Sequence, residues 1–223
     1  MPTVDSVSSF AGNGVGPFTW AHTCSGADRL LRVTVSHFDS SDAVTDITYN
    51  GVALTAVPGG ATTNGQYWIT AYYLIAPDVG TYNIVVTVSG NVFDFGAGAI
   101  SYNDVHQTVP LGTAVTATGT GTTPTVDVSS AADELVDDGL VIVHGGTLSV
   151  GAGQTQRWNA ITTTGFIKYA GSTEVGAAST TMSWSNSSSQ TWAIVAVPIK
   201  PTAGAPATSI VPHQAYYRRR RAA

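Results

Sequence analysis

The chain has 223 residues, of which 43% are hydrophobic and only 10% carry a charge. The hydrophobic fraction supplies a sizeable core and excludes global disorder, while the charged fraction lies well below the roughly 25% of an average soluble protein. Threonine, serine, asparagine and glycine take the place of the missing charges. This composition is typical of short strands with polar outer faces joined by tight turns, and it disfavours helices.

The net charge of −5 conceals an uneven distribution. Residues 1–217 carry five basic and fourteen acidic side chains, a net charge of −9, and residues 218–221 then add four arginines. The body of the chain should repel nucleic acid at a distance, whereas its end should be attracted to anionic surfaces. We therefore expect no nucleic-acid partner for the body.

The single cysteine, Cys24, excludes an internal disulfide and is expected to be a buried or loop thiol. Residues 1–5 show neither the basic nor the apolar region of a signal peptide. No apolar run approaches the roughly 18 residues that span a membrane. We therefore expect a chain that folds in the cytoplasm and has no membrane partner.

Alternating and β-branched runs predict strands along most of the chain. Residues 30–38 place leucine and valine on one face, at 31, 33 and 35, and more polar residues on the other. Asn50 and Gly51 lie between two apolar runs and predict a type I′ hairpin, because both central residues of that turn need a positive φ. Further strands are predicted at residues 68–75, 81–89, 93–102, 113–118, 123–128, 139–144, 162–169, 180–184 and 192–199.

Turn residues separate these strands at intervals of about 8–14 residues, a spacing that predicts a sandwich or a barrel. No repeat of fixed period is evident, and only residues 131–138 suit a turn of helix. We predict one all-β domain of the β-sandwich or jelly-roll type over residues 1–200, followed by an extended C-terminal arm over residues 201–223.

The arm begins with proline, alanine and threonine residues that are typical of an extended linker, and its end is apolar and then basic. Three interpretations of the arginines stay open: contact with nucleic-acid phosphates, docking on an acidic protein surface such as a neighbouring copy, or a solvated tail. Because the body is acidic, association between copies is electrostatically favourable. The predicted assembly residues are Ile210, Val211, Tyr216, Tyr217, Arg218, Arg219, Arg220 and Arg221.

The densest group of carboxylates consists of Asp133, Glu134, Asp137 and Asp138. Calcium needs about six to eight converging oxygen ligands, and the spacing here does not match an EF-hand loop. We interpret the group as a solvated loop that precedes a strand. We expect no metal and no cofactor, and these four residues are the candidates should a metal bind.

Catalytic signatures are absent from the sequence. The five histidines form neither His-x-His nor His-Glu-x-x-His, and there is no Gly-x-Ser-x-Gly motif. Glutamate is scarce, so no acid–base pair of the glycosidase kind can be named. We predict no catalytic residue and no enzymatic activity.

Aromatic residues offer candidates for a ligand face. Trp20, Trp68 and Trp192 lie in alternating apolar runs and are expected in the core. Trp158 and Trp184 have polar neighbours on both sides. They are therefore the candidates for an exposed face on which a sugar ring would stack.

Residues 28–36, 44–55, 68–87 and 99–105 follow a recognisable pattern. Its first parts read Arg-Leu-Leu-x-Val-x-Val-Ser and Val-Thr-x-Ile-Thr-Tyr-x-Gly-x-x-Leu-Thr. The pattern resembles a β-sandwich module of bacteriophage virion proteins and of bacterial surface proteins, and it covers residues 1–115 well and the rest loosely. Its motifs are turns and inward-facing positions, so the resemblance implies a fold and transfers no catalytic residue.

The resemblance and the arm together predict a structural protein of a tailed-phage virion, either a capsid decoration protein or a head or tail fibre component. It would fold in the host cytoplasm and reside in the virion. Its expected partners are other virion proteins and further copies of itself, bound through strand addition or groove docking of the arm. The alternative is a carbohydrate-binding or lectin-like module for a host surface glycan, a function that a virion surface domain can also carry.

Overall fold

The computed structural model describes residues 1–202, in which every regular element is a β-strand and every strand pairing is antiparallel. The prediction of an all-β protein is therefore confirmed. The turn of helix predicted at residues 131–138 is wrong, because residues 132–133 form a simple turn and a strand begins at Leu135.

The first half of the chain forms two sheets. The five-stranded sheet has the order β1-β9-β3-β7-β6, with the bounds Thr3–Val15, Asn91–Asn103, Leu30–Phe38, Tyr67–Ile75 and Thr55–Asn64. The four-stranded sheet has the order β2-β8-β4-β5, with the bounds Phe18–Cys24, Gly80–Val88, Val44–Tyr49 and Val52–Ala53. The predicted hairpin joins β4 to β5, and Asn50 and Gly51 both have a positive φ, of 49° and 77°.

The second half also forms two sheets. The five-stranded sheet has the order β10-β17-β12-β15-β14, with the bounds Val115–Gly121, Gln190–Ile199, Leu135–Val143, Ile167–Val175 and Thr155–Ile161. The three-stranded sheet has the order β11-β16-β13, with the bounds Thr125–Val128, Thr180–Asn186 and Leu148–Val150.

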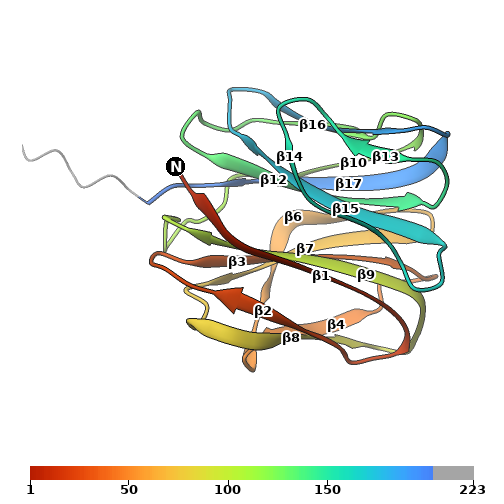
Figure 1. Cartoon of the computed structure of the whole chain (residues 1–223), viewed down its shortest axis with the longest axis horizontal. Coiled ribbons are helices and arrows are strands. Elements are labelled where there is room, and N and C mark those ends of the chain that lie inside the picture. Colours follow the sequence, from red (N-terminus) through yellow and green to blue (C-terminus); the bar gives the residue numbers. More distant parts are fainter. Residues whose placement is uncertain (203–223) are drawn as a thin grey trace, which may run out of the picture.

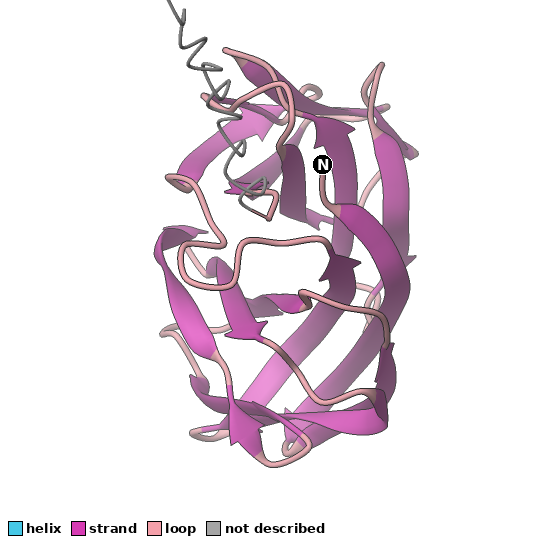
Figure 2. Ribbon diagram, turned by 90° about the vertical axis from the view of Figure 1, so that its left-hand side faces the viewer, coloured by secondary structure: helices cyan, strands magenta, loops and turns pink. Residues whose placement is uncertain are grey.

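The sheets stack as four layers (Figure 1). The smaller sheets are outermost, and the two five-stranded sheets face each other in the middle. The view turned by 90° shows the same stacking, and the chain leaves the described part near the N-terminus (Figure 2). The sequence predicted one sandwich of two sheets, whereas four stacked sheets are present.

Both halves share one strand topology, which the sequence did not indicate. If β1 to β4 correspond to β10 to β13 and β6 to β9 correspond to β14 to β17, the strand order of each large sheet is the same. The register agrees as well, because Leu30 pairs with Ile75 and Tyr102 while Leu135 pairs with Val175 and Ile199. Arg32 and Asp137 are therefore equivalent positions.

Three hydrophobic cores lie between the four layers. The first outer core includes Trp20 and Val33, and the second outer core includes Leu140 and Trp184. Between the two large sheets lies a third core, here called the seam, whose buried members come from both halves: Leu30, Val57, Ile69, Ala71, Ile100, Tyr102, Val105, Ala114, Leu135, Val141, Trp158, Ile167, Tyr169, Ala193, Val195, Val197 and Ile199. Both faces of each large sheet are thus buried.

The predicted strands agree with the observed strands in some places and differ in others. The strand predicted at residues 30–38 has the observed bounds, but its more polar face, including Arg32 and Ser36, is buried as well. The strand predicted at residues 162–169 begins only at Ile167, and the residues before it form a loop. The strands β1, β2, β6, β13 and β14 were not predicted, although β2 alternates buried and exposed residues around Trp20.

Glycines allow the two large sheets to approach each other. A Cβ added at Gly98 would lie 2.1 Å from Cε2 of Trp158, and one added at Gly96 would lie 2.3 Å from Cδ1 of Tyr169. Large rings of the second half therefore rest directly on the backbone of β9. Side chains at these glycines would push the sheets apart.

We predict that Gly98→Ala lowers the free energy of unfolding by about 1–3 kcal/mol, because the added methyl group overpacks the seam. The measurement is urea unfolding followed by tryptophan fluorescence. Gly90→Ala is the matched control, since a Cβ at Gly90 meets no atom within 4 Å. Equal losses in the two variants would contradict the close approach at Gly98.

Candidate functional site

Both tryptophans that were predicted to form an exposed ligand face are buried. Trp158 is 8% exposed and lies in the seam, and Trp184 is 1% exposed and lies in the second outer core. The prediction is wrong because the polar neighbours of each ring are the outward-facing residues of an alternating strand. Among the tryptophans predicted in the core, Trp20 and Trp192 are buried, whereas Trp68 is only half-buried.

The four candidate metal ligands do not converge. Asp133 is exposed in the turn before β12, while Asp137 and Asp138 are buried on opposite faces of β12. The interpretation as a solvated loop is therefore wrong for these two residues, since the strand begins earlier than predicted. Among residues 1–202, no cluster of three or more histidine, cysteine, aspartate or glutamate side chains could hold a metal ion.

Asp137 forms a buried ion pair with Arg32 across the seam. The guanidinium donates from Nη2 to Oδ1 at 3.0 Å and from Nε to Oδ2 at 3.1 Å. The hydroxyl of Tyr102 also donates to Oδ2, and the remaining Nη1 of Arg32 donates to the carbonyl of Tyr72. The carboxylate is thus fully occupied in holding the two large sheets together.

Asp138 points into the second outer core. Its Oδ1 accepts hydrogen bonds from the backbone N and the Oγ of Ser172, and its Oδ2 accepts one from Nε1 of Trp184 at 2.7 Å. Burial raises the pKa of this carboxyl to about 7, although these hydrogen bonds act in the opposite direction. The group is enclosed by the core and has no access to a substrate.

The assembly residues predicted in the arm, Ile210, Val211, Tyr216, Tyr217 and Arg218 to Arg221, lie outside the described residues. The loops beside the point where the chain leaves, at Thr202, are described. Strand register places residues 25–29, 76–79, 103–104 and 129–134 at this end, here called the exit end. Its acidic residues are Asp28, Asp78, Asp104, Asp133 and Glu134.

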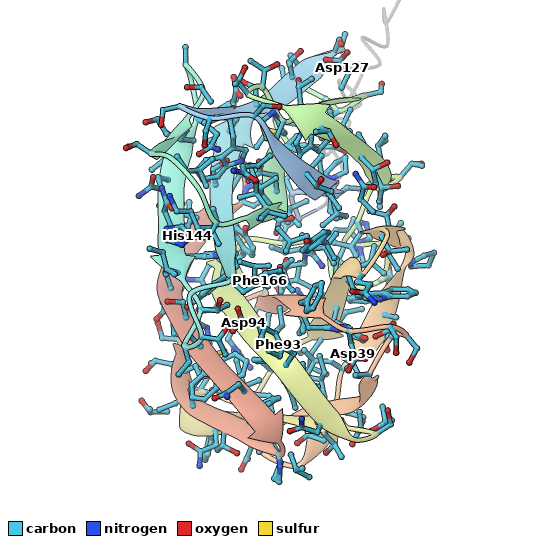
Figure 3. The ribbon with its side chains drawn as sticks, turned by 90° about the vertical axis from the view of Figure 1, so that its right-hand side faces the viewer. Asp39, Phe93, Asp94, Asp127, His144 and Phe166 are labelled. Atoms are coloured by element: carbon cyan, nitrogen blue, oxygen red, sulfur yellow. The ribbon has the colours of Figure 1, made fainter. Side chains whose placement is uncertain are left out.

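The opposite end carries an exposed aromatic cluster, here called the aromatic patch: Phe38, Tyr67, Phe93 and Phe166. Phe93 is 52% exposed and Phe166 is 37% exposed. The ring centroids of Phe38 and Phe166 are 4.7 Å apart, and those of Phe93 and Phe166 are 5.7 Å apart. Figure 3 shows Phe93 and Phe166 one above the other at the level where the two halves meet.

A buried carboxylate anchors the loop that carries Phe166. Asp94 is fully buried and accepts hydrogen bonds from the hydroxyl of Thr162 and from the backbone N of Phe166 and Ile167, the last two at 3.2 Å. Asp94 belongs to the first half of the chain and the loop belongs to the second. The patch is therefore held at the junction of the two halves, with Asp94 beside Phe93 in Figure 3.

One serine–histidine pair exists among the described residues, and its geometry does not suit catalysis. The Oγ of Ser8 lies 2.8 Å from Nδ1 of His22, and Trp20 donates to the same Oγ. Burial lowers the pKa of His22 to about 4. The side chain is buried and its Nε2 has no hydrogen-bond partner, so no carboxylate orients the ring as it would in a catalytic triad.

No family model matches this chain, and neither a curated protein nor a solved structure matches it. The resemblance to the virion module therefore stays a prediction. Within residues 1–202, no helix is long and apolar enough to cross a membrane.

Asp138 gives a prediction for the pH dependence of stability. Its pKa in the folded chain lies above the ordinary value of 3.8, so the stability linked to its proton is present in full below about pH 4. That stability is lost as the pH rises through 7. Relative to the native chain, Asp138→Asn should gain free energy of unfolding as the pH rises from about 4 to about 7, by about 1.4 kcal/mol per pH unit.

The measurement is urea unfolding of both proteins at several pH values. The quantity compared is the difference between their free energies of unfolding at each pH. The contribution of His22 is common to both and cancels in that difference. Asp133→Asn serves as the control because this side chain is exposed in the preceding turn. A difference that stays constant from pH 5 to pH 8 would show that Asp138 does not titrate in this range.

Proposed function

We propose that this chain is a structural protein of a tailed-phage virion, a decoration or fibre component that acts by binding other subunits and not by catalysis. The observation that carries the proposal is the aromatic patch. Monomeric soluble proteins rarely expose contiguous apolar clusters without a function, and aromatic side chains are enriched where proteins meet. The half-exposed rings of Phe93 and Phe166 are suited to contact a neighbouring copy of the chain.

The setting of the patch supports this proposal. Its four rings pack against one another, and the loop bearing Phe166 is tied down by the buried Asp94. A rigid surface loses little conformational entropy when a partner binds. The patch therefore offers apolar area at a low entropic cost.

The charge of the exit end supports a second contact, made by the arm. Five carboxylates lie in the loops of this end, and Arg29 is the one arginine or lysine among residues 25–29, 76–79, 103–104 and 129–134. The four arginines of the arm have the complementary charge. We infer that the arm of one copy docks at the exit end of its neighbour and ties the copies together.

We further infer that residues 1–200 behave as one folding unit despite their two sandwiches. The seam takes its buried residues from both halves, and the ion pair between Arg32 and Asp137 crosses it. Either half alone would expose an apolar sheet face and one unpaired charge. This supports a single domain in the sense of one cooperative unit.

The first prediction of this proposal concerns the arm. Light scattering of the full-length chain should give a discrete oligomer, whereas a chain of residues 1–202 should be a folded monomer or a much weaker oligomer. Removal of the arginines takes away charge-assisted pairs with the exit end, so high salt should weaken the full-length oligomer as well. An unchanged mass after truncation would refute the role of the arm.

The second prediction concerns the aromatic patch. Phe93→Ser combined with Phe166→Ser should raise the dissociation constant of the full-length oligomer by more than about tenfold, since burial of each ring is worth about 1.5–3 kcal/mol. Val7→Ser is the matched control, because Val7 is exposed in the middle of β1, outside both the aromatic patch and the exit end. Equal effects of the two changes would mean that the patch is not the interface.

A further inference from the structure

A lysine of the second half is buried without a counter-ion. Lys168 lies on β15, is 7% exposed, and donates from Nζ to the carbonyl of Gly146. Among residues 1–202 no carboxylate lies within 4.0 Å of this ammonium. An ammonium has three N–H groups, so two of them have no protein acceptor here.

Such an arrangement is unfavourable unless something pairs with the charge. Lysine is rarely buried without a partner, because loss of water around an ammonium costs several kcal/mol unless hydrogen bonds or an opposite charge replace it. Lys168 is not enclosed on all sides, since it lines an open cavity of about 490 Å3. The spare N–H groups thus have room for a ligand.

The equivalent place in the first half is filled. Lys168 pairs with Ile142 in the sheet, as Trp68 pairs with His37, so the two residues occupy the same position of the shared topology. The indole of Trp68 stacks on the ring of His37 at a centroid distance of 6.2 Å and donates to the carbonyl of Asp39. In the second half a lysine stands in the place of this indole, and it lines the cavity.

Two further polar side chains of the cavity offer acceptors, beside the hydroxyl of Thr147, which can donate or accept. Both N–H groups of Asn159 are used, toward the carbonyl of Leu148 and Oε1 of Gln156, which leaves Oδ1 free to accept. Nδ1 of His144 lies 2.9 Å from the carbonyl of Gly165 and must carry the proton, which leaves Nε2 as the acceptor of the neutral ring. The site therefore offers one cation, two side-chain acceptors and one hydroxyl.

Apolar side chains complete the lining. Leu148 and Ile161 border the cavity, and Ile161 is half-exposed. They offer a surface for the C–H face of a small ring. A cavity of this volume falls within the range of small-ligand sites, about 300–1,000 Å3.

We propose that this cavity binds an acidic sugar, with the carboxylate on Lys168 and the hydroxyl groups on Asn159 and His144. A uronate unit of a surface polysaccharide has the required chemistry: one carboxylate, several hydroxyl donors and an apolar ring face. Phosphate or sulfate fits less well, since such anions need several donors and would face the two acceptors. The site adjoins the aromatic patch, since the backbone N of His144 donates to the carbonyl of Phe166 at 2.9 Å, but the two share no residue.

The experiment is a titration of the full-length protein with D-glucuronate, D-glucose and inorganic phosphate, followed by the amide NMR signals of Gly146 and Ile161. We expect glucuronate to bind at least tenfold more tightly than glucose, because a charge-assisted hydrogen bond is lost with the neutral sugar. Phosphate should bind more weakly than glucuronate. Equal binding of glucose, or of phosphate, overturns the proposal.

The chain contains two lysines, Lys168 and Lys200, which provides a matched pair of variants. Lys168→Met should weaken glucuronate binding at least tenfold, and Lys200→Met should leave it unchanged. Should Lys168→Met fail to fold, reductive methylation of the native chain gives the same answer. Glucuronate, but not glucose, should slow the methylation of Lys168, and neither sugar should slow the methylation of Lys200. Methylation of Lys168 that glucuronate does not slow overturns the proposal.

The outcome is independent of the assembly proposal. A folded Lys168→Met chain should keep the oligomeric mass of the native chain in light scattering while it loses glucuronate binding. A chain that assembles but never binds glucuronate contradicts only the sugar site. A chain that binds glucuronate as a stable monomer contradicts only the assembly.

Discussion

The stacking of the two five-stranded sheets depends on how one buried ion pair is satisfied in the seam between them. Arg32 and Asp137 meet there with both carboxylate oxygens bonded, and Tyr102 and the carbonyl of Tyr72 satisfy further polar atoms. Removal of one partner of such a pair typically costs about 3–5 kcal/mol. A displacement of one sheet along the other would have the same effect, so the pair opposes every other register of the stack.

The rest of the molecule follows from this stacking. Because the large sheets bury both faces, each needs a second layer on its outer side, and the smaller sheets supply it through the two outer cores. The close approach at Gly96 and Gly98 brings Tyr169 and Trp158 onto the backbone of β9. The same junction places Phe166 beside Phe93 and so creates the aromatic patch.

The sequence predicted the local structure of several strands and turns. The bounds of β3 and the hairpin at Asn50 and Gly51 were predicted correctly, since alternation and a positive φ are local properties. The four-layer stack was not predictable from alternation, because alternation reports one buried face and β3 has two. Trp158 was misplaced for a related reason: its polar neighbours face solvent, while the sheet that covers its ring lies about sixty residues away in sequence.

The candidate sites could not be predicted from the sequence, for a different reason. The aromatic patch joins β3, β7, β9 and the loop before β15, and no spacing along the chain relates these positions. Lys168 stands out as a candidate ligand-binding residue only when the strand registers of the two halves are compared, because it then occupies the position of Trp68. The acidic residues at 133–138 were visible in the sequence, but the burial of Asp137 and Asp138 depends on where the strand begins, and Leu135 precedes the predicted start.

The equivalence of Arg32 and Asp137 has a consequence for which surfaces can recognise each other. Two copies of the first half, stacked in the observed way, would bring one guanidinium against another, and two copies of the second half would bring two carboxylates together. Like charges without water between them repel strongly. Only a first half stacked on a second half avoids this repulsion, so like halves do not stack on each other. The charge pair therefore excludes association of two copies through like halves.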